Sequence, residues 1–581
     1  MTTNTKLFTI RRGMFAAAGV FMAMQCLPAY AQLPAAADRA ATGSANPGRI
    51  QEQFENGDLI PQVSPRVEVK DLILQQVPEG AEDIRLVLNS LEMEGVTAYT
   101  PAQLQGVYAD KLGQNISLAD VYGIAAALTN KYRNEGYILT QVIVPPQTIE
   151  GGVVRLQVVE GYVDNVAVTG KDDESAKTLI RTYASHIQTG KALNVRDLER
   201  YLLLINDLPG VEARSILSPS QTQTGAADLR IIIERDPYDA LLAIDNYGSR
   251  YLGPTQLSAA GAANSYFGNN ERISGQVVLT PDPTTEPELA FIALGYEHPV
   301  WDNGTKVQLN FSNTNTEPGF NLKEFNVHGR SLFYSVKLTH PFIRARSQNL
   351  YGHVLFDWRN VDSSNNLEPT RRDRIRALRA GGSYEFLDTL LGVGVNSADI
   401  QFSKGIDILG SSDEDDARLT RPFADPEFFK MTAALQRLQR VSSNLNLLVS
   451  AEGQWSADAL LSSEEFGVGG INFGRGYAPS EIVGDDGISG KIELQLNKPY
   501  PWDLVEDYQL FGFYDVGVVW NKDATASAQK RDSLASAGLG IRTEFEADTK
   551  ADLALAVPLT RDVETKDSQG AQVYFSLSKG F

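Results

Sequence analysis

Apolar and polar residues alternate in many short runs between about Asp236 and Phe581, the last residue of the 581-residue sequence. A period of two with one apolar face predicts β-strands, and turn signals such as Asn303-Gly304 and Asp486-Gly487 separate the runs. The clearest alternating runs are 307–312, 332–339, 445–451, 492–497 and 553–557. This part of the chain is therefore predicted to be a long series of strands.

A mixed pattern of strands and helices precedes this series and occurs twice. Residues 84–99 are predicted as strand, 100–114 and 117–135 as helices, and 137–144 and 153–159 as strands. The same order returns at 163–168, 175–188, 194–208, 211–217 and 229–234. Ser117 and Asp120 have the spacing of a helix cap, and Pro209-Gly210 ends the last helix. Two β-α-α-β-β units of this size suit binding modules with an open sheet edge, and inert spacers are the alternative.

The first 31 residues have the pattern of a secretory signal. Three basic residues precede the apolar run Met14–Met24, and Ala29-Tyr30-Ala31 forms a small-x-small cleavage site. The run is shorter than the about 20 residues that a transmembrane anchor needs, and Gln25 is a poor neighbour for a lipoprotein site at Cys26. Cleavage after Ala31 removes the single cysteine and three positive charges, so the formal charge changes from -20 to -23.

Residues 32–80 are rich in Ala, Pro, Gln and acidic groups and contain one candidate helix. Asn46-Pro47 supplies a cap and a first-turn proline for Gly48–Asn56, which has no sustained apolar face. Such a helix is not expected to be stable alone. It is either part of a tether or a removable plug that is helical only when enclosed.

Composition excludes several classes of function. The chain has 72 Asp+Glu against 52 Lys+Arg, which opposes nucleic acid as a partner. No stretch after residue 31 is apolar enough for a helical membrane span. Motifs for metalloproteases, serine hydrolases and phosphate-binding loops are missing, and the five histidines are dispersed. We therefore predict no catalytic residue, no cofactor and no metal; the acidic run 411–416 is interpreted as a solvated loop.

The apolar face of the predicted strands can meet either a protein core or lipid. A soluble sandwich turns this face inward, whereas an outer-membrane barrel turns it outward around a polar lumen. The final strand favours the barrel, because Val573, Phe575, Leu577 and Phe581 alternate with polar residues and the chain ends on an aromatic. Sixteen strands would leave about 21 or 22 residues for each strand and its connection, and fourteen or eighteen also fit.

This order of segments resembles the transporters of two-partner secretion, the haemolysin and filamentous-haemagglutinin secretion/activation proteins of the Omp85 superfamily. The β-α-α-β-β units are similar to POTRA domains, and the junction Leu208-Pro209-Gly210-Val211 is typical of them. The resemblance implies an outer-membrane β-barrel of sixteen antiparallel strands preceded by two α+β POTRA domains. Its implied divisions are a signal at 1–31, plug helix and linker at 32–80, POTRA domains at 81–161 and 162–235, and the barrel at 236–581.

The same resemblance implies a function and partners. The protein would bind an unfolded exoprotein through periplasmic POTRA domains and pass it through the barrel to the cell surface. That exoprotein would be an adhesin, a haemolysin or a contact-dependent toxin. The other partners would be outer-membrane lipid and, through Phe581, the barrel assembly machinery. Alternatives are a barrel assembly factor, an autotransporter-translocating protein of the same superfamily, and a passive porin.

The most specific local match is Phe473-Gly474-Arg475-Gly476-Tyr477. It resembles the Arg-Gly-Tyr/Phe tip of the family's sixth extracellular loop, which folds into the lumen, here near 464–490. The family often has an apolar residue where Gly474 stands. A guanidinium inside a barrel needs a carboxylate, and Asp515 is the candidate because Phe513 and Asp515 occupy the family's Phe-x-Asp pattern.

Each residue of this predicted site has a role. Gly476 would allow the tight tip, Tyr477 would pack on the luminal wall, and Arg475 would bind Asp515. The alternative is a surface loop with a solvated arginine.

Overall fold

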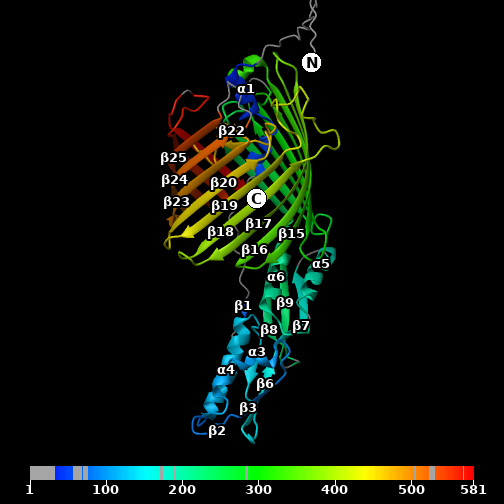
Figure 1. Ribbon diagram of the computed structural model, residues 1–581, viewed down its shortest axis with the longest axis vertical. Coiled ribbons are helices and arrows are strands. Elements are labelled where there is room, and N and C mark those ends of the chain that lie inside the picture. Colours follow the sequence, from blue (N-terminus) through cyan, green and yellow to red (C-terminus); the bar gives the residue numbers. More distant parts are fainter. Residues whose placement is uncertain are drawn as a thin grey trace, which may run out of the picture.

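The computed structural model describes residues 33–55, 68–69, 76–170, 174–188, 190–221, 223, 225–281, 286–502, 505–522, 530–566 and 568–581. The predicted signal segment, with Cys26, lies outside these described residues. Figure 1 shows a large barrel with two small domains in line beneath one of its ends. Within the described part of the chain, no helix has the length and apolar character needed to cross a bilayer.

Sixteen antiparallel strands form the closed barrel, each pairing with its neighbours in chain order and β10 pairing with β27. The strands are β10 (Tyr238–Asp245), β11 (Gln256–Asn264), β12 (Arg272–Thr280), β13 (Leu289–Pro299), β14 (Lys306–Thr316), β15 (His328–Arg344), β16 (Gln348–Ser364), β17 (Arg371–Asp388), β18 (Gly394–Gly405), β19 (Phe429–Arg440), β20 (Leu445–Ser456), β23 (Asp486–Trp502), β24 (Val505–Trp520), β25 (Arg531–Phe545), β26 (Thr549–Pro558) and β27 (Gln572–Gly580). The predicted fold class and strand number are confirmed.

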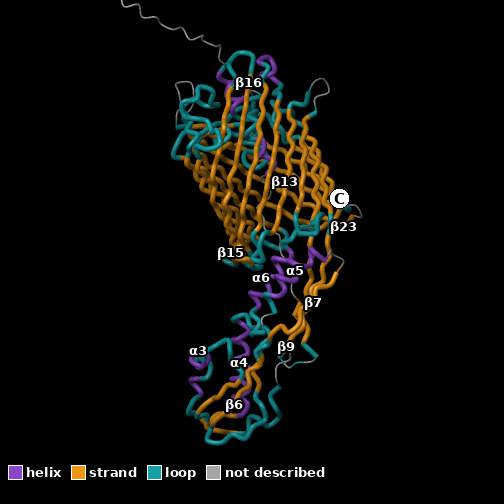
Figure 2. The backbone as a smooth tube through the Cα atoms, turned by 90° about the vertical axis from the view of Figure 1, so that its right-hand side faces the viewer, coloured by secondary structure: helices purple, strands orange, loops and turns teal. Residues whose placement is uncertain are grey.

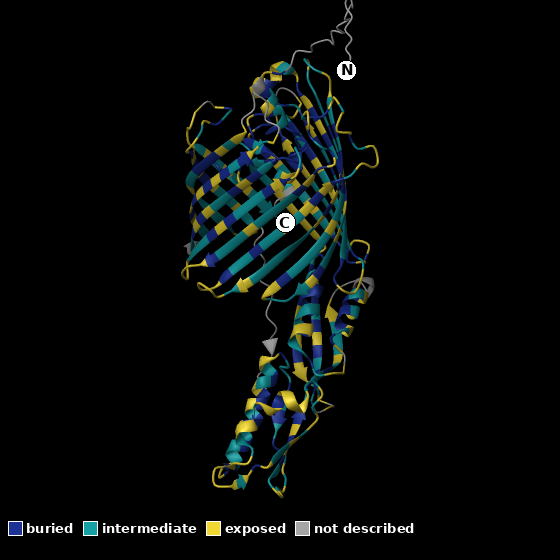
Figure 3. Ribbon diagram, viewed as in Figure 1, coloured by how far each residue is buried: buried dark blue, intermediate teal, exposed yellow. Residues whose placement is uncertain are grey.

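The alternating pattern decides which face of each strand points outward. On β24 Leu510, Tyr514 and Val516 are 42%, 46% and 45% exposed, whereas Phe513 and Asp515 are buried. The same alternation of exposed and buried residues runs along the other strands in Figure 3. The barrel therefore carries an apolar outer surface and encloses a polar interior, as an outer-membrane barrel requires.

The first small domain holds two helices against a three-stranded sheet of order β3-β6-β5. Its elements are β2 (Arg85–Val87), β3 (Ser90–Glu94), α3 (Pro101–Gln105), η1 (Ala109–Lys111), β4 (Asn115–Ser117), α4 (Leu118–Asn134), β5 (Gln141–Ile143) and β6 (Val153–Val159). Ser117 and Asp120 form the predicted capping box of α4. The helix expected over 100–114 is only one turn long: α3 ends at Gln105, and the chain continues through a turn into the short η1.

The second small domain repeats this plan with a four-stranded sheet of order β1-β8-β9-β7. Its elements are β1 (Glu68–Val69), β7 (Tyr162–Gly170), α5 (Glu174–Ser185), α6 (Val195–Asn206), β8 (Val211–Pro219) and β9 (Ala226–Arg235). The two helices and the sheet share one apolar core that includes Ile180, Leu198 and Ile231. β1 comes from the amino-terminal segment and pairs in parallel with β8.

The second small domain lies next to one end of the barrel (Figure 2), and polar contacts join the two. Arg344, at the end of β15, donates two hydrogen bonds of 2.8 and 2.7 Å to the carboxylate of Asp207, which follows α6. His186 lies 3.1 Å from Asp302 in the turn between β13 and β14. These contacts fix the domain beneath the mouth of the barrel.

Candidate functional site

The loop between β20 and β23, residues 457–485, folds into the barrel. It contains a short hairpin of β21 (Phe466–Val468) and β22 (Ile482–Gly484). Phe466, Val468 and Tyr477 of this loop are buried in one apolar cluster with Val519 and Leu534 of the wall. Apolar packing along the wall therefore holds the loop against β24 and β25.

Arg475 of the loop and Asp515 of β24 are distant along the chain but form an ion pair inside the barrel. Arg475 Nε donates to Asp515 Oδ2 at 2.9 Å, and Nη2 donates to Oδ1 at 2.7 Å. The backbone N–H groups of Gly474 and Arg475 also donate to Asp515 Oδ2, at 3.2 and 3.0 Å. The Arg475 and Asp515 side chains are only 4% and 0% exposed. A bidentate, dry ion pair of this kind is strong and directional.

Two further charged residues, Glu493 and Arg542, extend this ion pair into a network, and the sequence analysis did not single them out. Arg475 Nη1 donates to Glu493 Oε2 at 2.6 Å, and Arg542 donates to Glu493 Oε1 at 2.7 Å. Glu493 lies opposite Phe513 in the pairing of β23 with β24. Its place on the polar face of the 492–497 run is the signal that could have identified it, although that signal does not give the register between strands.

The other predicted residues surround this pair. The Arg475 guanidinium lies over the Phe513 ring, 3.5 Å from its centroid, which is a cation–π contact. Gly476 has φ +103° and its N–H donates to the Tyr574 hydroxyl at 3.1 Å. The Tyr477 hydroxyl donates to the Ala535 carbonyl at 3.1 Å. The loop tip is thus bonded to strands on both sides of it.

The structure also accounts for Gly474, where the family often has an apolar residue. Gly474 has φ +96°, a conformation that strains any residue with a side chain. A Cβ at this position would lie 2.8 Å from Leu534 Cδ1 and 3.1 Å from Gly469 Cα. In this barrel the Leu534 side chain occupies the space that an apolar residue would need.

The amino-terminal segment forms two helices inside the barrel. They are α1 (Ala35–Thr42), seen near the top of Figure 1, and α2 (Ile50–Glu55). The prediction over 48–56 corresponds to α2, which starts two residues later, whereas α1 was not predicted. Ala40 and Ile50 are each 1% exposed and pack in one cluster with Phe291 of β13. Enclosure therefore supplies the contacts that the segment lacks alone.

The plug, defined as residues 33–55, contacts the inward-folded loop and the wall. Arg49 Nη1 donates to the carbonyls of Ser462 and Glu465 at 3.0 and 2.8 Å. Arg359 of β16 donates to the Gly48 carbonyl at 2.7 Å. Asp38 of α1 pairs with Arg371 of β17 at 2.7 Å. Plug, loop and wall therefore share one set of contacts.

Comparison with known proteins bears on what this arrangement does. The sequence profile of the haemolysin secretion/activation protein family ShlB/FhaC/HecB matches residues 228–543, more than half of the chain. The chain belongs to this family. The profile of the ShlB-type POTRA domain matches residues 86–161, the first small domain.

Individual known proteins resemble most of the length of the chain. The heme/hemopexin transporter protein HuxB of Haemophilus influenzae strain 86-028NP is 22% identical over 93% of this chain and 96% of its own. The outer membrane transporter CdiB of Escherichia coli is 23% identical over 80% of this chain and 77% of its own. The solved structure of Escherichia coli CdiB has a TM-score of 0.73 and 19% identity, and covers 88% of this chain and 93% of its own.

Family membership settles the class of function. The chain is an outer-membrane transporter of two-partner secretion, with a POTRA domain before its barrel, and it is not an enzyme. Among the described residues, no group of three or more His, Cys, Asp and Glu side chains is placed to hold a metal ion. The candidate site is therefore the channel itself, with its inward-folded loop and its plug.

Proposed function

We propose that the two small domains capture an unfolded segment of one exoprotein by adding it as a strand to a sheet edge. Among the described residues, β3, β5 and β7 are each paired on one side only, which supports this mode of binding. β8 of the second domain already carries β1 of the same chain along its outer edge. The edges of β3 and β5 are therefore the better candidates in the first domain, and that of β7 in the second.

In this proposal the barrel then conducts the exoprotein as an extended chain. The signal at 1–31 is removed on export, 32–80 provides plug and linker, 81–161 and 162–235 are the POTRA domains, and 236–581 is the barrel. The loop held by Arg475 and Asp515 shapes the channel, and the plug closes it at rest. Because the sequence has no phosphate-binding motif, folding of the exoprotein outside the cell provides the drive and makes transport one-way.

One observation carries the proposal. Two elements of the same chain lie in the lumen, and both are held by noncovalent contacts with the wall: four hydrogen bonds to Asp515 hold the loop tip, and the guanidinium of Arg359 holds the plug. A passive porin would need an open lumen, whereas a secretion channel must be closed until its substrate arrives. An adhesin, a haemolysin or a contact-dependent toxin remains the expected class of substrate.

The experiment compares the proteomes of culture supernatant, cell surface and outer membrane in a strain that lacks this chain. The strain is restored with the wild type, with Arg475→Ala, or with Arg440→Ala, an exposed arginine at the end of β19. We expect one large exoprotein to be lost, and to be recovered with the wild type and Arg440→Ala but not with Arg475→Ala. A general fall in outer-membrane barrels would indicate an assembly factor, and no change would indicate a porin.

The plug is tested separately in planar bilayers. Deletion of residues 45–56 is expected to raise single-channel conductance, because it removes α2 and Arg49 from the lumen. Channels that stay closed after this deletion would contradict the role of the plug.

A further inference from the structure

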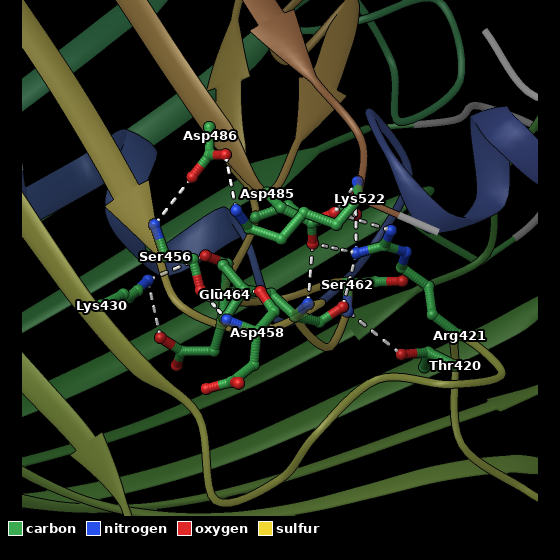
Figure 4. Close-up of polar contacts among 12 residues, drawn as sticks. Thr420, Arg421, Lys430, Ser456, Asp458, Ser462, Glu464, Asp485, Asp486 and Lys522 are labelled. Atoms are coloured by element: carbon green, nitrogen blue, oxygen red, sulfur yellow. Dashed lines mark hydrogen bonds and ion pairs between the residues drawn. The ribbon is translucent and has the colours of Figure 1, made fainter. Parts of the chain in front are cut away.

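The base of the inward-folded loop is held by a second buried ion cluster, on other strands than the tip. Glu464 is 1% exposed and its carboxylate accepts two hydrogen bonds from Arg379 of β17, at 2.8 and 3.1 Å. Lys430 of β19 lies 2.7 Å from the same carboxylate and also donates to the Glu464 carbonyl at 2.8 Å. Figure 4 shows Lys430 beside the carboxylate of Glu464.

One more carboxylate and one neutral hydrogen-bond donor also belong to the cluster. Asp357 of β16 forms an ion pair with Arg379, and Gln454 of β20 donates to the Glu464 carbonyl at 3.0 Å. Arg379, Lys430, Asp357 and Glu464 carry two positive and two negative charges, so the cluster is neutral. Loss of one charge would leave its partners buried without compensation, which is strongly unfavourable.

The same short stretch of the loop also contacts the plug. Arg49 donates to the carbonyls of Ser462 and Glu465, which lie two residues before and one residue after Glu464. A Cβ on Gly48 would lie 2.7 Å from the Ser463 Cβ, so plug and loop are in close contact there. Whatever fixes Glu464 therefore also fixes the carbonyls that Arg49 needs.

The two anchors of the loop attach to different parts of the wall. Arg475 at the tip binds Asp515 of β24 and Glu493 of β23, whereas Glu464 at the base binds β17 and β19. Arg49 bonds to the base and to the Ser480 hydroxyl, at 3.3 Å. The tip and the carbonyls that Arg49 binds are therefore held by different strands of the wall.

We propose that Glu464, with Arg379 and Lys430, is the anchor that seats the plug and so sets how often the channel opens at rest. This inference rests on the proposed function of the plug. Glu464, Arg379 and Lys430 are positioning residues, because they act on the plug through the loop backbone. The tip pair of Arg475 and Asp515 has the separate task of shaping the channel for transport.

The test is single-channel recording of the purified full-length protein in planar bilayers. Glu464→Gln keeps the shape of the side chain and removes its charge, and we expect the open fraction to rise about tenfold or more, as loss of a strong charge-assisted contact predicts. Arg49→Gln is expected to have a similar effect. The double variant should open little more than either single variant, because both changes release one contact.

Matched variants separate the explanations. Glu271→Gln is the control: this residue lies in the turn between β11 and β12, outside the loop, is also buried, and its carboxylate accepts N–H bonds from Phe267 and Asn269. It should leave the open fraction as in the wild type. Arg475→Ala should raise the open fraction less than Glu464→Gln does. Lys430→Gln serves where Glu464→Gln does not reach a folded state, which is checked by the heat-dependent gel shift of the barrel.

Each outcome decides the proposal. If deletion of 45–56 opens the channel but Glu464→Gln and Lys430→Gln do not, the second anchor is refuted and the plug survives. If the deletion itself leaves the channel closed, the proposed role of the plug fails and this inference fails with it. If Arg475→Ala opens the channel as much as Glu464→Gln, the base of the loop has no special task.

Discussion

Replacing Arg475 with lysine tests how the loop tip is held, because the change keeps the charge and removes the geometry. The arginine reaches Asp515 with Nε and Nη2 and reaches Glu493 with Nη1. A lysine has one nitrogen on a flexible stem and cannot reproduce the planar fork. It also loses the stacked contact of the guanidinium with Phe513 at 3.5 Å.

The size of the effect follows from these contacts. A hydrogen bond between charged, buried groups contributes about 1.5–3 kcal/mol. Lysine retains one or two of the three side-chain bonds, and the charge that remains still compensates the two carboxylates. We therefore expect the bound state of the loop tip to lose about 3 kcal/mol, which raises the population of the released tip about a hundredfold.

Thiol labelling measures that population. Val468, in the same loop, is 0% exposed and packs against the wall, so a cysteine there reacts only after the loop leaves the wall. Cleavage after Ala31 would remove Cys26, the single cysteine of the sequence, so Val468→Cys would be labelled alone. We expect the maleimide labelling rate on cells to rise about a hundredfold with Arg475→Lys, and secretion to fall. Arg440→Lys is the control.

An unchanged labelling rate with Arg475→Lys would refute the reasoning, because it would mean that charge alone holds the tip. Fast labelling together with normal secretion would instead separate the ion pair from transport.

Three further predictions concern other contacts. Asp207→Asn removes the charge that Arg344 binds at 2.7 Å. It should broaden the distribution of distances between spin labels on the second POTRA domain and on the barrel, measured by electron–electron double resonance. Gly476→Ala places a side chain at φ +103° with its Cβ 3.3 Å from Pro558 N; it should cost about 1–3 kcal/mol and reduce secretion in the proteome assay. Removal of Phe581, which is 70% exposed at the chain end, should lower the amount of barrel in outer-membrane fractions while signal cleavage stays normal.

The barrel could be predicted from the sequence because each strand carries its own signal. The alternation of Leu510, Tyr514 and Val516 with Phe513 and Asp515 shows which residues share a face, and the structure exposes the first set and buries the second. Which face a residue occupies depends only on its position along its own strand, since successive side chains point to opposite faces. That is also why Asp515 could be proposed as luminal without a structure.

The rest of the site depends on register between strands, which no single strand contains. Glu493 reaches Arg475 because β23 pairs with β24 so that Glu493 stands opposite Phe513. Arg542 joins them from β25, at 2.7 Å from Glu493. Glu464 needs Arg379 and Lys430 from two other strands. Such contacts arise only when the barrel closes.

Two helices show how a local sequence pattern can fail to predict structure: one helix was not predicted, and another was predicted too long. α1 was missed because its eight residues, Ala35–Thr42, are too few for a helix that is stable alone, and its apolar residues are alanines only; its stability comes from burial beside Leu322 and Phe291. The helix over 100–114 was predicted too long because its apolar residues continue beyond Gln105, where α3 ends and a turn leads into η1. Tertiary enclosure stabilises the first helix, whereas the second stops after one turn.

The inward-folded loop and the plug are held in the lumen by different kinds of contact. This difference determines which of them costs less free energy to release. The loop is held at tip and base by buried ion pairs, so its withdrawal would leave Asp515 and Lys430 without the charges that compensate them. Arg49 of the plug donates to neutral carbonyls, which water can satisfy when the plug leaves. α1 adds one ion pair, Asp38 with Arg371, whose side chains are 39% and 21% exposed and already meet water. Release of the plug therefore has the smaller cost, and in the proposed mechanism we expect the plug to leave before the loop moves.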